Sequence, residues 1–314
     1  MDIVLCTDDN FAVGAGTCIS SVLNHDGAEG CHFHIITFGL NVDNTQRFKL
    51  LAKERGCQID IHTVDAERFE GMMATDRFPK QIYLRYLAPE LIDADKSLYL
   101  DCDIVACGSL KTLWNTDISG VALAAVADQR GGDLPGDRED VEAHIGPYDH
   151  TYFNSGVLLL NHKVWREMDL TPKLIQAVKE HPSFALADQD ALNFLLRDKI
   201  VLLRHEFNYQ TDWYYLNPTT DGITLLHFNA ATPWRYGAPH QEVGLFDHVR
   251  CQSPWRDYCY AAHARVGRGG VKFLLPLWAI DRVLNRNITF RLASWIMVRY
   301  NWWRHGKRGA KERR

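Results

Sequence analysis

The chain has 314 residues, of which 46% are apolar and 24% are charged, as in a globular protein with one large domain, or one domain and an appendage. A formal net charge of −4 at pH 7 argues against nucleic acid as a partner. The first residues are acidic, so we expect no signal peptide, and no apolar run reaches the length of a membrane span.

Short apolar segments alternate with segments of helical spacing along most of the chain. We expect, in chain order, a strand at 3–6, a helix at 11–23, a strand at 32–38, a helix at 44–55, a strand at 57–64, a helix at 82–91, strands at 97–100, 121–127 and 153–161, helices at 164–179 and 189–197, and a strand at 223–228. This alternation predicts an α/β fold with a mostly parallel sheet and helices on both faces. Residues 128–150 are polar and contain Gly and Pro, which favours a long loop or lid.

The composition changes near residue 250, where basic and aromatic residues become frequent. From Arg282 to Arg314 there are ten Lys or Arg residues and one Glu. We therefore expect one domain over residues 1–250 and a small, basic helical appendage over residues 251–314.

Eight cysteines are scattered along the chain without a C-x-x-C pair, which indicates reduced core thiols in a cytosolic protein. They are Cys6, Cys18, Cys31, Cys57, Cys102, Cys107, Cys251 and Cys259. A zinc site is the alternative, because Cys31, His32 and His34 lie close together. These three residues lack a second ligand pair at the usual spacing, which argues against zinc.

Polar residues follow several expected strands at the point where each strand ends. The sequence TDDN (residues 7–10) follows the first strand, Asp101 and Asp103 follow the strand at 97–100, and His227 lies near the end of the last one. Ligands of parallel sheets bind beyond the carboxyl ends of the strands. Two carboxylates one residue apart suit a hard divalent cation, and an added imidazole shifts the choice from Mg²⁺ toward Mn²⁺. A solvated turn is the alternative interpretation of an isolated D-x-D pair.

Two further motifs have a structural and a functional interpretation. GAGTCI (residues 14–19) has only two of the three glycines of a dinucleotide fingerprint and lies inside a helix, so close helix packing explains it better. Asp188 either caps the helix that follows it or, with Gln189, lies at the mouth of a site and holds hydroxyls of a polar ligand.

Six blocks together resemble glycosyltransferase family 8, in particular its bacterial lipooligosaccharide and lipopolysaccharide galactosyl- and glucosyltransferases. The blocks are IVLCTDDNF, IYLRYLAPELI, SLYLDCDIV, FNSGVLLLN, ADQDALN and LLHFNAATPW, and they extend over roughly residues 1–250 in the order of the family. The resemblance implies a GT-A, Rossmann-like fold, a donor such as UDP-galactose or UDP-glucose, and transfer with retention to a lipopolysaccharide or another surface glycan.

The resemblance also implies roles for individual residues. It places Asp101, Asp103 and His227 as ligands of Mn²⁺, with Mg²⁺ as the alternative. Asp8 and Asn10 would contact the uridine and ribose. Arg85 and Asp188 would hold sugar hydroxyls, and Asn154 and Gln189 would lie beside the reacting carbon.

A divalent cation would stabilise the negative charge that builds on the departing diphosphate without any proton transfer. The Gln189 amide is a poor nucleophile, which favours attack from the same face of the sugar over a double displacement.

The last block departs from the family pattern H-x-x-G-x-x-K-P-W. It is one residue shorter and has Thr232 where the family has the Lys that reaches the diphosphate. Arg235 is the candidate substitute. The departure keeps a second hypothesis open, namely a non-catalytic or weakly active nucleotide-sugar binding protein. A nucleotidyltransferase is the third hypothesis, but residues 7–16 lack the basic glycine-rich phosphate loop that it needs.

The last segment, Phe290 to Arg314, mixes aromatic with basic residues. Such a segment suits the surface of an anionic bilayer, to which each nearby Lys or Arg contributes about 1 kcal/mol. We therefore expect a cytoplasmic protein attached peripherally to the inner face of the cytoplasmic membrane. A final helix packed on the catalytic domain is the alternative.

Overall fold

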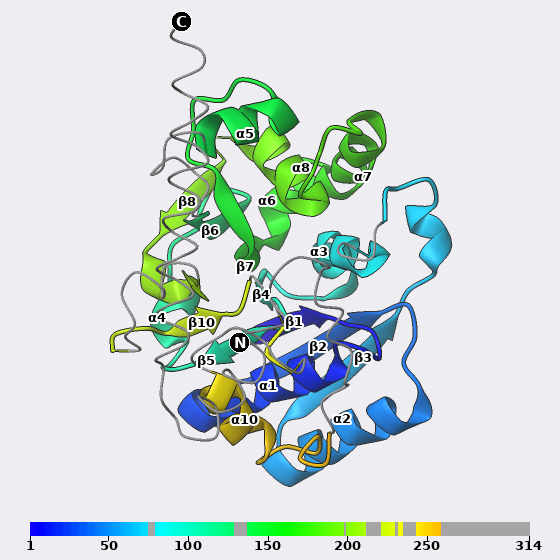
Figure 1. The fold of residues 1–314 in the computed structure, drawn as a ribbon, viewed down its shortest axis with the longest axis vertical. Coiled ribbons are helices and arrows are strands. Elements are labelled where there is room, and N and C mark those ends of the chain that lie inside the picture. Colours follow the sequence, from blue (N-terminus) through cyan, green and yellow to red (C-terminus); the bar gives the residue numbers. More distant parts are fainter. Residues whose placement is uncertain are drawn as a thin grey trace, which may run out of the picture.

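The computed structural model describes residues 1–74, 79–128, 137–197, 199–211, 221–229, 232–234 and 243–258. Its centre is a seven-stranded sheet in the order β3-β2-β1-β4-β7-β6-β8 (Figure 1). These strands are β1 (Asp2–Cys6), β2 (His32–Thr37), β3 (Gln58–Thr63), β4 (Lys96–Leu100), β6 (Leu123–Ala127), β7 (Phe153–Asn161) and β8 (Ile200–Leu203). Neighbouring strands are parallel except at β7, which is antiparallel to both β4 and β6. The predicted α/β fold with a mostly parallel sheet is confirmed.

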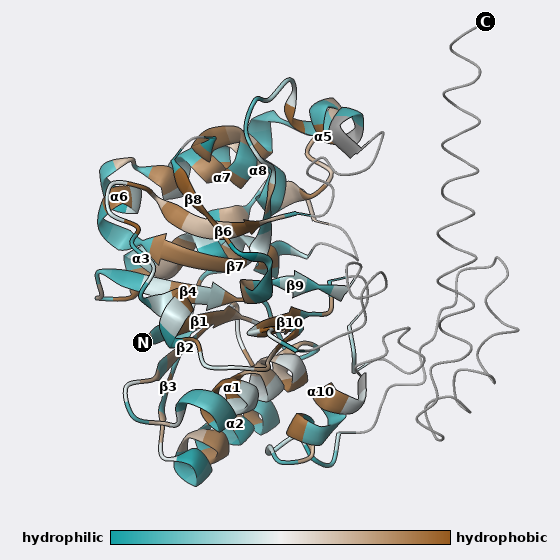
Figure 2. Cartoon of the chain, turned by 90° about the vertical axis from the view of Figure 1, so that its left-hand side faces the viewer, coloured by the Kyte–Doolittle hydropathy of each residue, from teal (hydrophilic) through white to brown (hydrophobic). Residues whose placement is uncertain are grey.

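Helices cover both faces of this sheet because successive residues of its buried strands point to opposite faces. In β1, Ile3 and Leu5 join a core beneath the helices of one face, whereas Val4 and Cys6 join the core of the other. The first face carries α1 (Ala12–Asp26), α2 (Val42–Arg55), α4 (Lys111–Trp114) and α10 (Val243–Arg250). The second carries α3 (Ala88–Leu91), α6 (His162–Glu167), α7 (Leu170–Glu180) and α8 (Ala187–Leu196), with the 3-10 helices η1 (Ala66–Phe69) and η2 (Lys80–Leu87). The strand β7 between these layers is coloured as hydrophobic in Figure 2.

A second, three-stranded sheet lies beside the first, in the order β5-β10-β9. Its strands are β5 (Ile104–Ala106), β10 (Leu225–His227) and β9 (Tyr209–Gln210), and the 3-10 helix η4 (His205–Phe207) precedes β9. β10 is antiparallel to β5, and the register pairs His227 with Ile104. Only β10 was predicted, as part of the apolar run expected as a strand at 223–228. The two or three residues of β9 and β5 show no period in the sequence. This sheet positions the candidate site, since it brings the end of β10 to the residues that follow β4.

Three predicted elements differ from the structure. Residues 82–91 form the end of η2 and then α3 instead of one helix. The helix expected at 164–179 is divided into α6 and α7, and Asp169 between them has a positive φ of 54°. The loop expected at 128–150 contains α5 (Asp137–Ile145), whose Val141 and Ile145 are four residues apart and buried, while residues 129–136 lie outside the described part. The helical spacing of Val141 and Ile145 was overlooked because the residues before them are rich in Gly and Pro.

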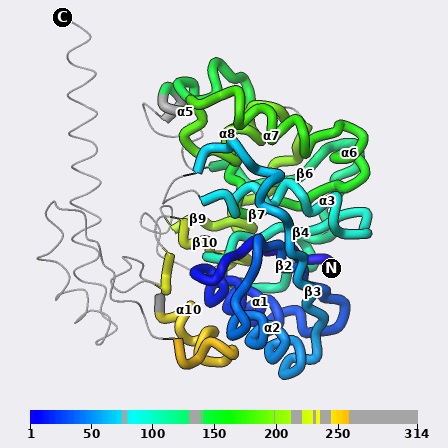
Figure 3. The backbone as a smooth tube through the Cα atoms, turned by 90° about the vertical axis from the view of Figure 1, so that its right-hand side faces the viewer, coloured from blue at the N-terminus to red at the C-terminus, as the bar shows by residue number. Residues whose placement is uncertain are grey.

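The two glycines of GAGTCI serve packing, as predicted. A Cβ on Gly14 would overlap the ring of Trp234, and a Cβ on Gly16 would overlap the ring of Trp255. Figure 3 shows α10, from late in the chain, beside α1 and α2 from its start. Residues 251–258 continue this packing, because Trp255 is buried and Asp257 pairs with Arg47 of α2. The appendage was predicted to begin at residue 251, but the described part of the domain extends to residue 258. The rest of the predicted appendage, residues 259–314 with Cys259, lies outside the described residues.

Seven described cysteines are free thiols, and Cys251 differs from the prediction of core thiols because it is exposed. Within the described residues, no helix combines the length and apolarity needed to cross a membrane.

Candidate active site

The two aspartates that follow β4 meet His227 from the end of β10. The Nε2 atom of His227 lies 3.3 Å from Oδ1 of Asp103 and 3.8 Å from Oδ2 of Asp101. Two backbone bonds fix this approach: the N–H of Asp101 donates to the carbonyl of Gly156 at 2.8 Å, and the N–H of Phe228 donates to the carbonyl of Asp103 at 2.9 Å. The structure therefore brings together the three residues predicted to bind a metal.

The orientation of the His227 ring is fixed by an amide from the segment before β9. Asn208 donates from Nδ2 to Oδ1 of Asn154 at 2.8 Å, so its own Oδ1 is the acceptor that lies 2.9 Å from Nδ1 of His227. The His227 Nδ1–H must then be the donor, which leaves the Nε2 lone pair directed at the aspartates. Burial alone would lower the pKa of His227, but Asp103 and Asp101 raise it above its ordinary value. The site therefore attracts positive charge.

These three side chains fit a divalent cation. Their ligand atoms all lie within 4.8 Å of one another, and two carboxylates with one imidazole form a donor set suited to Mn²⁺. Gly156 of β7 makes the close approach possible, because a Cβ there would overlap the His227 ring and lie 2.9 Å from Oδ2 of Asp101. A side chain at position 156 would displace the imidazole.

Arg85, at the end of η2, links Asp101 to Asp188 of α8. Its Nη2 lies 3.1 Å from Oδ1 of Asp101, its Nη1 lies 3.0 Å from Oδ2 of Asp188, and its guanidinium carbon lies 4.5 Å above the Tyr99 ring. Burial raises the pKa of Asp188 to about 6, although Arg85 and a hydrogen bond from the Ser155 hydroxyl both act to lower it. These charges are buried and paired, so they hold one side of the site rigidly in place.

Asp188 does not cap α8, which begins at Ala187. The carboxylate that closes the first turn belongs to Asp190, which accepts the backbone N–H of Leu186 at 2.9 Å. The N-cap interpretation of Asp188 is therefore wrong, and its carboxylate faces Arg85 and Ser155 instead.

Asn154 and Gln189 form a buried polar network with Asp128, the residue that follows β6. Oδ2 of Asp128 accepts from Nδ2 of Asn154 at 3.0 Å and from Nε2 of Gln189 at 3.1 Å. Oε1 of Gln189 accepts the backbone N–H of Ser155 at 3.0 Å. Asp128 and Asn208 were not among the predicted site residues. Asp128 carried the same signal as Asp101, a carboxylate directly after an apolar strand, but it was counted as the start of the loop.

Asp8 and Asn10 lie at the carboxyl end of β1, beside the start of α1. Oδ1 of Asp8 accepts the backbone N–H groups of Asn10 at 2.9 Å and of Phe11 at 3.0 Å, so Asp8 organises this turn. Thr232 has a buried hydroxyl with no hydrogen-bond partner among the described residues, and Arg235 lies outside them. A nucleotide contact of Asp8, Asn10 or Arg235 stays a prediction.

Known proteins resemble the chain over this whole domain. It is 32% identical over 218 residues to general stress protein A of Bacillus subtilis, covering 67% of this chain and 74% of that protein. It is 29% identical over 247 residues to the lipopolysaccharide glucosyltransferase WaaO of Escherichia coli, covering 73% and 70%. A solved structure of the galactosyltransferase LgtC, in complex with donor and acceptor sugar analogues, superposes with a TM-score of 0.72 at 27% identity, covering 82% of this chain and 99% of LgtC.

The likeness to LgtC confirms the GT-A fold that the resemblance implied. Residues 2–238 match the family described as glycosyl transferase family 8, and they include each described residue of the site discussed above. The chain therefore belongs to glycosyl transferase family 8, and it is a glycosyltransferase in fold and in family.

Proposed function

We propose that the protein transfers galactose or glucose from a UDP-sugar to a lipopolysaccharide or another surface glycan, with retention and with Mn²⁺ as the metal. The observation that carries this proposal is the cluster of Asp101, Asp103 and His227 beside the polar network of Asn154 and Gln189. Asp101, Asp103 and His227 would hold the cation. When bound there, Mn²⁺ supplies positive charge for the leaving diphosphate.

The surrounding residues suit the rest of the reaction. Arg85 and Asp188 present buried, opposite charges at the wall of the site, where sugar hydroxyls find both donors and acceptors. Gln189 has its carbonyl oxygen engaged by Ser155 and its amide nitrogen by Asp128, which holds the side chain in one orientation. A neutral amide held in this way supports attack from the same face, because it leaves Gln189 no role as a nucleophile.

The test is release of UDP by the purified full-length chain. Wild-type protein is incubated with UDP-galactose and with UDP-glucose, in Mn²⁺, in Mg²⁺ and in EDTA. We expect UDP release from one of the two donors, and only when metal is present. Asp103→Asn should lose this release. Asp117→Asn is the matched control, since Asp117 is an exposed aspartate of a turn that holds Ser119. Metal-independent release, or equal activity of Asp103→Asn, contradicts the proposal.

A second candidate is a nucleotide-sugar binding protein with little or no turnover. Thr232 favours it, because it stands where the family has a Lys that reaches the diphosphate, and Arg235 is the candidate replacement. Calorimetry with both UDP-sugars separates the two candidates: binding without release supports the second. If Arg235 replaces the Lys, Arg235→Gln lowers turnover more than it lowers donor binding.

We also propose that the basic segment at 282–314 attaches the protein to the cytoplasmic face of an anionic membrane. This segment lies outside the described residues, and its sequence alone supports the proposal. Truncation after Asp281 should abolish binding to anionic vesicles at low salt and leave hydrolysis of the UDP-sugar largely intact. If the full-length chain does not bind such vesicles, or if the truncated chain unfolds, the membrane proposal is wrong. Either result leaves the proposed enzymatic activity untouched.

A further inference from the structure

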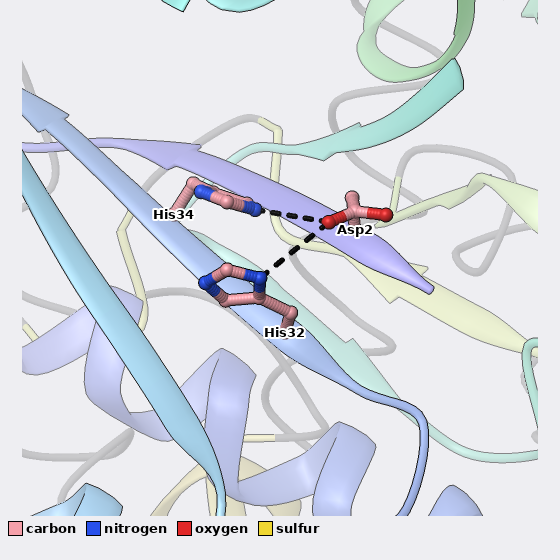
Figure 4. A group of neighbouring side chains, drawn as sticks. All are labelled: Asp2, His32 and His34. Carbon is pink, nitrogen blue, oxygen red and sulfur yellow. Dashed lines mark hydrogen bonds and ion pairs between the residues drawn. The ribbon is translucent and has the colours of Figure 1, made fainter. Parts of the chain in front are cut away.

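A second cluster of metal-capable side chains lies at the opposite, amino-terminal edge of the sheet. Asp2 begins β1, His32 begins β2, and the parallel register places these two residues side by side. His34 follows two residues later and therefore points to the same face as His32. Figure 4 shows both imidazoles directed at the Asp2 carboxylate, and the ligand atoms of all three residues lie within 4.8 Å of one another.

The spacing of these atoms fits four-coordinate zinc. Zinc bonds to imidazole nitrogen and carboxylate oxygen are about 2.0–2.2 Å long, so neighbouring ligand atoms of a tetrahedral site lie about 3.3 Å apart. Oδ1 of Asp2 lies 3.1 Å from Nε2 of His34 and 3.6 Å from Nδ1 of His32. A small inward movement of His32 would shorten the longer of these two distances, and the His32 side chain is 29% exposed and so has room to move.

The other ring nitrogen of each histidine already has a partner on β3. Nε2 of His32 lies 2.7 Å from Oδ2 of Asp60, and Nδ1 of His34 lies 3.1 Å from Nε2 of His62. Zinc-bound histidines show this arrangement, in which the second nitrogen donates to an acceptor that fixes the ring. Gln58 donates to the same Asp60 oxygen at 3.1 Å, so the acceptor is itself held in place.

The exposure and the chemistry of these side chains favour binding of a zinc ion. Asp2 is 29% exposed, which leaves space for a water as the fourth ligand, whereas the His34 side chain is 5% exposed. Two imidazoles with one carboxylate suit zinc better than Mg²⁺ or Mn²⁺. Cys31, the zinc ligand considered from the sequence, is buried in the core on the other face of the sheet, and the missing ligand comes from Asp2, thirty residues away in the chain.

We propose that Asp2, His32 and His34 form a zinc site that joins β1 to β2, separate from the active site. It lies at the far end of β1, roughly 13 Å from the carboxyl edge, given a rise of about 3.3 Å per residue. Its role is structural, because the ligands and their partners tie together the three strands β1, β2 and β3.

The test measures Zn²⁺ binding by the full-length chain, without a histidine tag, after removal of metal with a chelator. An Asp101→Asn/Asp103→Asn background removes the carboxylates of the active-site cluster, so the remaining binding reports on the proposed site. We expect one equivalent of Zn²⁺, and a visible spectrum typical of four-coordinate cobalt when Co²⁺ replaces it. Saturation with Zn²⁺ should also raise the melting temperature.

Further substitutions in this background test which side chains bind the zinc ion. His32→Gln and Asp2→Asn should each weaken binding by about a hundredfold or more, and His62→Gln by about tenfold to a hundredfold. His25→Gln, an exposed histidine at the end of α1, is the matched control and should bind as the background does. Circular dichroism establishes that each variant is folded; His34→Gln is added as a third ligand variant if it folds. Absence of the single equivalent, or full binding by His32→Gln, overturns the proposal.

Discussion

Opposite edges of the large sheet carry clusters built from the same two residue types, yet the clusters are embedded differently. At the carboxyl end, His227 is buried and Asp101 is tied to Arg85 and Tyr99, so every group has a fixed partner. At the amino end, Asp2 and His32 are each 29% exposed, and the far sides of the two imidazoles are held by Asp60 and His62 of β3. The two clusters share one pattern of burial, two partly exposed groups and one buried histidine, so they differ in what holds them. The buried Arg85 beside Asp101 suits a reaction that must position a charged leaving group, whereas polar partners on β3 suit a stabilising ion.

The origin of the ligands differs as well. The amino-edge cluster arises from two neighbouring strands, so pairing β1 with β2 is enough to assemble it. The carboxyl-edge cluster needs the second sheet, because His227 reaches Asp103 only when β10 pairs with β5. The active site therefore depends on more of the fold than the proposed zinc site does, and the following changes separate the two edges.

The largest expected effect is at the carboxyl edge. Asp103→Asn should lower UDP-hexose turnover by about a thousandfold, because loss of the metal charge forfeits roughly 4 kcal/mol of transition-state stabilisation. Asp2→Asn at the other edge should keep turnover within about twofold. Initial rates of UDP release at saturating Mn²⁺ measure both. Similar losses in the two variants would show that the edges are not independent.

Arg85→Met should lower the free energy of unfolding by about 3–5 kcal/mol, since it leaves the buried charge of Asp188 without its cationic partner. Arg68→Met is the control: Arg68 pairs with Glu90 at 2.8 Å, but both side chains are substantially exposed, so we expect a cost of about 1 kcal/mol or less. Urea unfolding of both variants provides the comparison. Equal costs would mean that the buried pair is not what stabilises this wall of the site.

Asn208→Ala should weaken Mn²⁺ affinity by about tenfold to a hundredfold, because the His227 ring loses the acceptor that fixes its tautomer. The maximal rate at saturating Mn²⁺ should fall less than the affinity does. A titration of activity with Mn²⁺ gives both quantities. Unchanged affinity would show that the aspartates alone position the imidazole.

The smallest expected effect concerns His162, which follows β7 at the amino edge and whose Nε2 lies 2.7 Å from the Ser97 hydroxyl. Burial, with a contribution from Arg166, lowers the pKa of His162 to about 4. The unfolded chain, with a histidine pKa near 6.5, therefore binds more protons between these values, and stability falls as the pH falls. Acidification from about pH 7.5 to about pH 5 should cost about 2 kcal/mol through this group.

His162→Asn should remove that share of the pH dependence. Burial also lowers the pKa values of His34 and His62, so these groups weaken stability in acid in the same direction. The informative quantity is the difference between wild type and His162→Asn in urea unfolding at the two pH values. His25→Asn serves as the exposed control. A variant with the full wild-type pH dependence would exclude His162 as a source.

The long elements were predictable because their signals are local. β7 is nine residues long and contains the apolar run VLLL at 157–160, and Asp101 and Asp103 ended a visible strand. Contacts that depend on tertiary pairing were not predictable. Asn208 sits in an irregular segment before the two-residue β9, and nothing in the sequence places it against His227. The zinc interpretation was rejected for the same reason, since only the pairing of β1 with β2 brings Asp2 to the histidines.

The reversed direction of β7 connects the two edges of the sheet through a single strand. Because β7 is antiparallel to β4, its first residues reach the active site through Gly156, and its last residues lead into His162 at the far edge. Deletion of one residue in β7 would turn its following side chains to the opposite face. The length of this strand is therefore constrained from both ends at once, so an indel inside it should disable catalysis and alter the pH dependence of stability together.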